Sequence, residues 1–302
     1  MTLKEIFKNS FDLIRRNKGL LLLFWSTNAA MAVILSLPIY SILIDSLRNS
    51  LFNESLPGEI SYTWYVQFMR NYEGTISQMP LVIYGVVGIY IIIQTFYFGG
   101  MVAVFHNPKK NHISDFFYGG VRYWFRFTKV LLISLALFIF AFKLNDLLGN
   151  LFTWILSDYE HYLTDFILRS LRYILLLVFI GVVTIFSDYS KVIIAVDEKD
   201  EVFKAIKKSS NFLKNNLRLT SSVFLIIASL GALGAVVYNV IDNFMPRTSY
   251  YLLLLSFILQ QLLIIFRLAI KMMFCSSEVV IYNDSIAEFV KADIKESTIG
   301  VK

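Results

Sequence analysis

The sequence predicts an all-α integral membrane protein with six transmembrane helices, and three observations lead to that prediction. First, 57% of the 302 residues are hydrophobic and only 17% are charged, whereas a soluble globular chain averages about 45–50% apolar and about 25% charged residues. Second, the apolar residues are gathered into long blocks. Third, the basic residues are distributed unevenly among the segments between these blocks.

The apolar blocks are long enough to cross a bilayer, which requires roughly 20 mostly apolar residues. The segments that meet this length are about 19–44, 79–105, 127–149, 171–196, 217–242 and 250–282. The last is longer than a bilayer requires, so we expect it to tilt or to emerge as an ordinary helix. We therefore predict one polytopic membrane domain over residues 1–302, with a cytoplasmic tail at 283–302.

The first block could also be a signal peptide, because Ala30-Met31-Ala32 resembles a cleavage site. The apolar run continues well beyond it, through VILSLPIYSILI, and this favours an uncleaved span. Pro38 is expected to kink that span or to mark its outer end.

The basic residues predict the orientation of the chain. Of the 28 Lys and Arg residues, nineteen lie before the first block, around the second and fourth loops and in the tail, five lie on the opposite side, and four lie within the blocks. The positive-inside rule then places both termini in the cytoplasm, together with the second and fourth loops. The net charge of +6 is a topology signal and an attraction to anionic lipid headgroups, and its placement argues against nucleic acid as a partner.

The cytoplasmic segments are amphipathic. Within residues 3–17 a single helical face carries Leu3, Ile6, Phe7, Phe11 and Ile14, which predicts a helix lying in the membrane interface. The pattern returns at about 113–124 and about 203–217. In the third copy the residues predicted to contact lipid headgroups are Lys204, Lys207, Lys208 and Lys214.

The first and third amphipathic segments align without gaps, as FKNSFDLIRRN (7–17) against IKKSSNFLKNN (206–216). In a weaker middle copy, Phe117 and Arg126 fall opposite Phe7 and Arg16. This pattern predicts three repeated units, each an interfacial helix followed by a hairpin of two spans. The alternative is that basic, amphipathic loops resemble one another in any protein of this class.

The run DYSKVIIAVDEKDEVFKAIKKSSNFLKNN (188–216) resembles a bacterial family of six-span membrane domains. One branch of that family is the membrane domain of some glycerophosphoryl diester phosphodiesterases, and other members are stand-alone membrane proteins of unknown function. The residues that carry the resemblance are Asp188, Val192–Val196, Asp197 or Glu198, Ala205 and Ser209. The chain has no catalytic barrel, so the resemblance implies the membrane fold and not the phosphodiesterase activity.

A search for catalytic motifs indicates a protein that is not an enzyme and holds no cofactor or metal. The three histidines fall on opposite sides of the membrane, and the motifs of zinc sites, phosphate loops and nucleophile elbows do not occur. The pairs Gly99-Gly100 and Gly119-Gly120 fit helix packing better than a nucleotide cradle. The single cysteine, Cys275, excludes an internal disulfide and fits a small buried residue.

Ionisable groups within the spans are the remaining functional signal, because they are costly there and are usually paired. The candidate intramembrane charge cluster is Asp188, Lys191, Arg267 and Lys271. Asp188 can pair with Lys191 on its own helix or with Arg267 across the bundle, either as a structural clamp or as part of a substrate or ion site. The uncharged polar residues expected to form hydrogen bonds between helices are Asn28, Gln94, Gln260 and Gln261.

Two functions follow from this pattern. The first is an accessory or structural membrane component that acts through lipids or protein partners. The second is a small transporter or lipid-handling permease with a site near Asp188 and Arg267. A polar cavity reaching the middle of the membrane would favour the second function, and a closed apolar bundle would favour the first.

Overall fold

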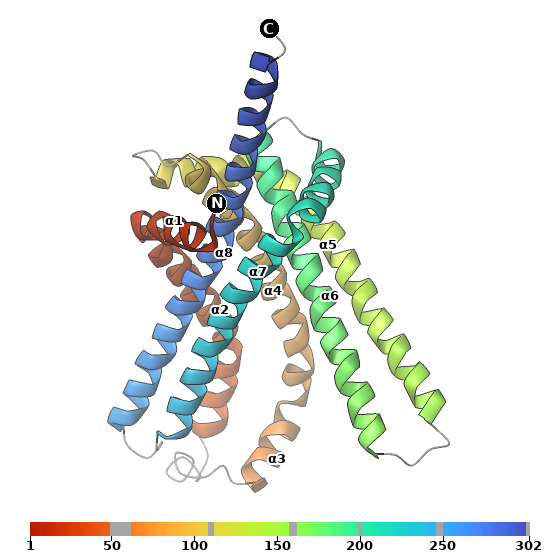
Figure 1. Cartoon of the computed structure of the whole chain (residues 1–302). Coiled ribbons are helices and arrows are strands. Elements are labelled where there is room, and N and C mark those ends of the chain that lie inside the picture. The colour runs from red at the N-terminus through yellow and green to blue at the C-terminus, as the bar shows by residue number, and fades with distance from the viewer. Residues whose placement is uncertain (49–61, 108–111, 157–161, 199–200, 246–249, 300–302) are drawn as a thin grey trace. The chain divides into compact units, whose positions relative to one another are not determined.

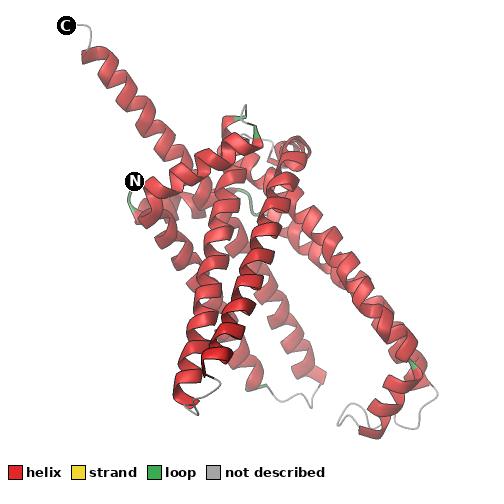
Figure 2. Ribbon diagram, turned by 90° about the vertical axis from the view of Figure 1, so that its right-hand side faces the viewer, coloured by secondary structure: helices red, strands yellow, loops and turns green. Residues whose placement is uncertain are grey.

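A computed structural model describes residues 1–48, 62–107, 112–156, 162–198, 201–245 and 250–299 of the chain. Nearly all of the described residues form helices, and they contain no strand (Figure 2). Six of the helices are long and apolar enough to cross a membrane. The prediction of an all-α protein with six candidate spans is therefore confirmed, which makes the chain a multi-pass membrane protein.

The helices follow one another as labelled in Figure 1. They are α1 (Leu3–Arg16), α2 (Gly19–Arg48), α3 (Tyr62–Asn71), α4 (Glu73–His106), α5 (His112–Leu156), α6 (Tyr162–Asp197), α7 (Val202–Asn243) and α8 (Tyr250–Ile299). The short helix α3 has no counterpart in the predicted spans. α2 continues through Pro38 to Arg48, so this proline does not end the helix.

The amphipathic segments and the spans that follow them are joined in different ways. After α1 the chain turns at residues 17–18 before α2 begins, and α7 is interrupted between its amphipathic segment and its span, whereas α5 runs from one into the other. α7 departs from helical backbone at Asn216, where φ is −118° and ψ is 22°. α8 extends beyond its predicted span, so residues 283–299 of the predicted tail are helical. Residues 300–302 lie outside the described residues.

The contacts divide the chain into two compact units. The first unit comprises Met1–Arg16, Thr95–Ala228 and Met272–Lys302, and the second comprises Asn17–Gln94 and Ser229–Lys271. α4, α7 and α8 each contribute one part to each unit. A single domain over the whole chain stays a prediction.

The core of the first unit contains the C-terminal parts of three helices. Fully buried residues occur on each of them, at Val102 of α4, Ile193 of α6 and Val279 of α8. In the same unit α5 and α6 pack along each other (Figure 1). The amphipathic segments also contribute to this core, because Ile6, Phe116 and Ala205 are each 0% exposed.

This burial corrects one prediction about α1. We expected its whole apolar face to lie in the membrane interface, yet Ile6 and Ile14 are buried within the protein. Leu3 and Phe11 remain exposed. The apolar face is wide enough to be divided between the protein core and the surroundings, and its periodicity alone does not show where the division falls.

Glycines allow α4 and α5 to approach closely within the first unit. Gly99 lies against Gly119 and Gly120, and a Cβ atom on Gly100 would come within 2.7 Å of the Phe116 carbonyl oxygen. The interpretation of both glycine pairs as helix-packing positions is therefore confirmed. Small residues at such contacts are the usual means by which helices associate in membranes, where lipid supplies no hydrophobic driving force.

We predict that Gly100→Ala lowers the melting temperature of the protein in detergent, because its methyl group would overlap both the ring and the backbone of Phe116. Overpacking of this kind costs about 1–3 kcal/mol. The matched control is Gly88→Ala in the same helix, where an added Cβ meets no atom within 4 Å. The control is expected to leave the melting temperature unchanged or to raise it. Equal melting temperatures for the two variants would contradict this account of the α4–α5 contact.

Candidate functional site

The ion pair between Asp188 and Lys191 is the centre of the candidate site. Both residues lie on α6 three positions apart, and their carboxylate oxygen and Nζ are 2.9 Å apart. Their side chains are only 20% and 13% exposed. The Lys191 ammonium also lies 4.9 Å from the centre of the Phe98 ring on α4, at a distance suited to a cation–π contact. Of the two partners predicted for Asp188, the structure shows the one on its own helix.

Glu278 of α8 is a third ionisable residue at this site, and the sequence analysis did not single it out. Its side chain is buried, at 5% exposed, and its Oε2 atom has no hydrogen-bond partner among the described residues. Asp188 and Lys191 both act on it electrostatically. The signal in the sequence was an acid within the last apolar block, where the predicted charge cluster included only Arg267 and Lys271.

The other two members of the predicted cluster belong to the second unit. Lys271 donates a hydrogen bond to Gln94 there, and Arg267 is exposed. The structure therefore distributes the four predicted residues over both units. The pairing of Asp188 with Arg267 stays a prediction.

Hydrogen bonds between helices are confirmed for three of the four amides predicted to make them. Gln94 pairs with Lys271, Gln261 accepts from the Trp25 indole N–H at 3.0 Å, and Asn28 accepts from the Tyr90 hydroxyl at 2.7 Å. All of these contacts lie within the second unit. A polar group in an apolar environment gains most from a partner on a neighbouring helix.

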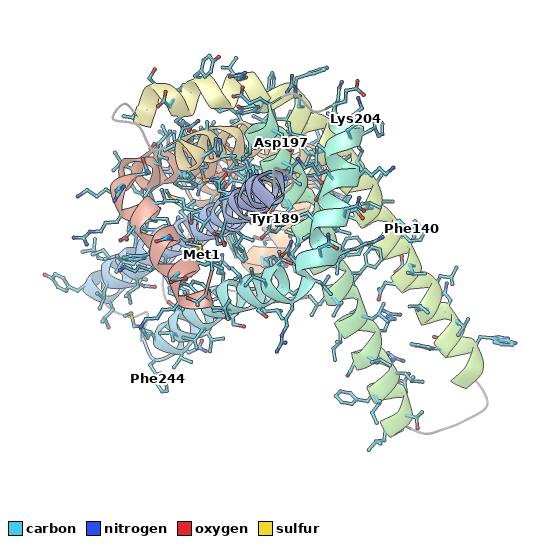
Figure 3. The ribbon with its side chains drawn as sticks, turned by 45° about the horizontal axis from the view of Figure 1, so that its top comes forward. Met1, Phe140, Tyr189, Asp197, Lys204 and Phe244 are labelled. Atoms are coloured by element: carbon cyan, nitrogen blue, oxygen red, sulfur yellow. The ribbon has the colours of Figure 1, made fainter. Side chains whose placement is uncertain are left out.

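Asp197, the last residue of α6, joins three helices in the first unit. Its carboxylate accepts a hydrogen bond from the Tyr282 hydroxyl of α8 at 2.9 Å and one from the Lys208 ammonium of α7. Tyr189 lies about two turns before Asp197 on the same helix (Figure 3), and its ring packs 5.3 Å from that of Phe212. The acid at the exit of this span is thus a structural junction.

The next residue, Glu198, is held by α5 in a left-handed backbone conformation with φ of 51°. This conformation is costly for a residue with a Cβ and commonly follows the end of a helix, usually at glycine. Three donors from α5 hold it there. Arg122 and Tyr123 donate to its carboxylate at 3.1 and 3.3 Å, and Arg126 donates to its carbonyl at 3.1 Å.

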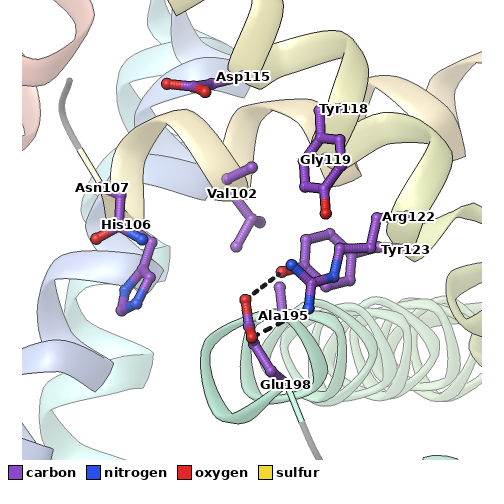
Figure 4. A pocket seen from close by; sticks show the side chains of 11 residues that line it. Val102, His106, Asn107, Asp115, Tyr118, Gly119, Arg122, Tyr123, Ala195 and Glu198 are labelled. Atoms are coloured by element: carbon purple, nitrogen blue, oxygen red, sulfur yellow. Dashed lines mark hydrogen bonds and ion pairs between the residues drawn. The ribbon is translucent and has the colours of Figure 1, made fainter. Parts of the chain in front are cut away.

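A polar cavity of about 220 Å³ opens beside this contact (Figure 4). Its wall includes Arg122 and Glu198, which are paired, together with Asp115 and Tyr118 of α5 and His106 of α4. His106 is tied to α8 by a 3.0 Å contact between its Nδ1 and the Asn283 side-chain oxygen. Across the described residues, no group of three or more His, Cys, Asp or Glu side chains is arranged to hold a metal ion.

The four lysines predicted to contact lipid headgroups differ in their surroundings. Lys208 is engaged by Asp197, and its ammonium lies 5.9 Å from the Tyr282 ring. Lys204 is 70% exposed at the start of α7 and lies 3.5 Å from Glu201 (Figure 3). Lys207 and Lys214 are exposed. Lys208 therefore has a structural contact that the amphipathic pattern did not reveal.

The first unit contains an apolar groove of about 330 Å³, and Lys214 is one of its lining residues. It is formed by α5, α6 and α7, with Leu137, Phe179 and Phe186 among its lining residues. Ser210 and Lys214 are the polar residues from the amphipathic part of α7 that line it. The groove is open at the surface, where Val182 and Leu217 are 59% and 63% exposed.

Comparison with protein-family models, with curated proteins and with solved structures gave no match for this chain.

We predict that Asp188 and Lys191 are energetically coupled. Asp188→Asn and Lys191→Met should each lower the melting temperature in detergent, because each leaves the other charge unpaired in a poorly hydrated place. The free energy of unfolding lost in the double variant should be smaller than the sum of the two single losses, by about 0.5–3 kcal/mol. A parallel cycle with Arg267→Gln tests the other predicted partner of Asp188. Additive losses for Asp188 and Lys191, with coupling between Asp188 and Arg267, would contradict the pairing described here.

Proposed function

We propose that the protein is an accessory or structural component of a bacterial inner membrane that binds anionic lipid on its cytoplasmic side. The observation that carries this proposal is the first part of α7, where the exposed Lys214 lines an open apolar groove and Lys207, two turns earlier on the same helix, is exposed as well. An anionic phospholipid has the matching chemistry, since its acyl chain suits the groove and its headgroup suits the lysines. The proposal assigns no catalytic role, cofactor or nucleic-acid partner, and it leaves protein partners open.

The proposed orientation places both termini in the cytoplasm, because most of the basic residues lie beside the segments assigned to that side. In this orientation the C-terminal ends of α4, α6 and α8 reach the cytoplasmic surface. The polar residues at these ends, including Asp197 and His106, would then lie where water and headgroups begin. Polar and charged groups are tolerated far better at that depth than in the hydrocarbon core.

We further propose that α1 and the first parts of α5 and α7 are interfacial helices. α1 begins with a capping box, in which the Thr2 backbone N–H donates to the Glu5 carboxylate at 2.8 Å and the Glu5 N–H donates to the Thr2 hydroxyl at 3.4 Å. The bond from the Thr2 backbone lowers the pKa of Glu5 below its ordinary value. Such a cap supports a helix with its own start, and the exposed Leu3 and Phe11 supply an apolar edge for the membrane boundary.

The same segments support the proposal of three repeated units. Residues that align between the copies share the same burial, since Ile6, Phe116 and Ala205 are fully buried. The positions four residues later are also buried, at Ser10, Gly120 and Ser209. In the first and third copies the aligned residues Asn17 and Asn216 both lie where regular helix is interrupted. Agreement in burial is more specific than a shared basic, amphipathic composition.

The alternative function is a small transporter or lipid-handling permease with a site near Asp188 and Arg267. The ionisable side chains of Asp188, Lys191 and Glu278 favour it, because such groups within spans often mark a substrate or ion path. Against it, the polar cavity is lined by the ends of α4 and α6 and by the first part of α5, while Met101, Val192 and Ile193 of α4 and α6 are 0% exposed. Closed packing at this level favours the accessory function. The resemblance to the phosphodiesterase-associated membrane domains is consistent with either and stays a prediction.

We predict that the double charge reversal Lys207→Glu and Lys214→Glu reduces the anionic phospholipid that co-purifies with the protein. Each basic residue near the surface contributes about 1 kcal/mol of attraction to anionic lipid, so the pair should weaken binding by roughly 30-fold. Native mass spectrometry of the purified protein with a defined anionic phospholipid gives the readout. Lys208 is left unchanged, because its replacement would also break the contact with Asp197.

The matched control is Arg48→Glu with Arg70→Glu, which changes the net charge equally at two exposed residues assigned to the opposite side. Retention of anionic lipid by this control should stay close to that of the wild type. Equal retention by the wild type and the Lys207/Lys214 variant would mean that these lysines direct topology alone, and the proposed lipid site would be wrong.

A further inference from the structure

The buried carboxyl group of Glu278 has no role in the proposed lipid site. Its side chain is 5% exposed and its Oε2 atom has no hydrogen-bond partner among the described residues. On the same helix the neighbours Met272, Cys275 and Val279 are each 0% exposed. The group is therefore removed from water on its own helix.

The charges around Glu278 do not balance. Asp188 and Lys191 of α6 act on it, but Lys191 is already paired with Asp188 at 2.9 Å. Phe98 of α4 occupies a further side of the Lys191 ammonium and carries no charge. The remaining titratable group that interacts with Glu278 is Tyr189 of α6, which is neutral at ordinary pH. With every other group in its usual state, two carboxylates would share one ammonium.

The serine hydroxyls of α8 next to Glu278 and that of Ser190 do not supply the missing hydrogen-bond donor, because each donates to a carbonyl of its own helix. Ser276 and Ser277 donate to the carbonyls of Met273 and Phe274 at 3.1 and 2.9 Å. Ser190 of α6 donates to the Phe186 carbonyl at 2.7 Å. An ionised Glu278 would thus be a buried charge with an incomplete set of partners, which is among the costliest arrangements in a protein interior.

We propose that Glu278, beside the Asp188–Lys191 ion pair, is a proton-binding site. One additional positive charge balances the three groups, and the proton is the cation that needs no cavity and no further ligands. A metal ion would require a set of at least three suitable side chains, and the described residues hold no such set. The bound proton makes the Glu278 carboxyl neutral and leaves Lys191 to Asp188 alone.

Proton binding at this position connects pH to the packing of the first unit. When the proton leaves, the Glu278 carboxylate competes with Asp188 for the Lys191 ammonium, and the ion pair within α6 is weakened. The buried residues nearest to Glu278 on α8 belong to the same core as Ile193 of α6. This consequence is independent of lipid binding and holds for either proposed function.

The first test is the pH dependence of unfolding in detergent for the wild type, Glu278→Gln and Glu201→Gln. In the unfolded protein Glu278 releases its proton at about pH 4.3, the ordinary value for a glutamate. At the proposed site the folded protein retains this proton. Raising the pH from about 5 to about 8 should therefore favour unfolding of the wild type, by up to about tenfold in the equilibrium constant per pH unit. Glu278→Gln should lack this component, because its amide mimics the neutral acid.

Glu201→Gln is the matched control, since it makes the same replacement at an exposed acid and should keep the slope of the wild type. Comparison with Glu278→Gln also removes the contribution of the other titratable groups, which the two proteins share. The second test is the infrared spectrum of the wild type at neutral pH, which should contain the carbonyl band of a protonated carboxyl group. That band should disappear in Glu278→Gln.

A wild type with the same slope as Glu278→Gln, or without a protonated-carboxyl band, overturns the proposal. Stabilisation of the wild type by sodium ions at constant pH, absent from Glu278→Gln, would assign the site to a metal cation instead and would also overturn it. If Glu278→Gln does not fold, the infrared spectrum of the wild type decides alone. A neutral carboxyl band supports the proton site, and its absence excludes it.

Discussion

The polar ends of α4, α6 and α8 satisfy one another inside the protein, and the rest of the first unit depends on that constraint. Lipid offers no hydrogen-bond partner, so a polar side chain near it must find one in the chain. Asp197 at the end of α6 accepts from Tyr282 of α8 and Lys208 of α7. His106 at the end of α4 contacts Asn283 of α8. These contacts connect the helices at the level where their apolar cores end.

The same constraint explains why the amphipathic segments are partly buried. In α1 one edge of the apolar face packs within the first unit through Ile6 and Ile14, and the N-terminal amine of Met1 pairs with Asp284 of α8 at 3.1 Å. The other edge keeps Phe11 exposed. A helix held in this way presents a fixed row of apolar and basic side chains at the surface. In the proposed function such a row contacts a lipid headgroup and acyl chain, and no folding step accompanies binding.

Much of the fold could be predicted from the sequence, because the bilayer imposes a strong and simple pattern on composition. The six candidate spans follow from the length of the apolar blocks, and the contacts of Asn28, Gln94 and Gln261 follow from the cost of isolated polar groups in lipid. The pairing of Asp188 with Lys191 was one of two possibilities. Spacing along a helix defines the local partner, whereas partners on other helices depend on how the helices rotate.

The residues that sequence reasoning missed are those whose role is set by packing between distant segments. Glu278 lies in an apolar block, and only the fold brings it near Asp188 and Lys191. Lys208 shares the basic pattern of its neighbours, and its contact with Asp197 arises because the chain folds back after α6. Likewise, the division of one apolar face between core and surface in α1 depends on the helices beside it. Periodicity records that a face is apolar, and tertiary packing decides what covers it.

The central claim is that the amphipathic segments and the polar ends of α4, α6 and α8 face the cytoplasm. Cysteine labelling of intact cells tests it most directly, in a Cys275→Ser background that removes the single native thiol. Tyr62 on α3 is 81% exposed and belongs to the side assigned to the exterior, whereas Ser114 is exposed at the start of α5, next to Asp115 of the polar cavity. A cysteine at Tyr62 should react with a membrane-impermeant thiol reagent in intact cells, and one at Ser114 should react only after the cells are permeabilised. Labelling of Ser114→Cys and not of Tyr62→Cys in intact cells would contradict the orientation and the lipid site that depends on it.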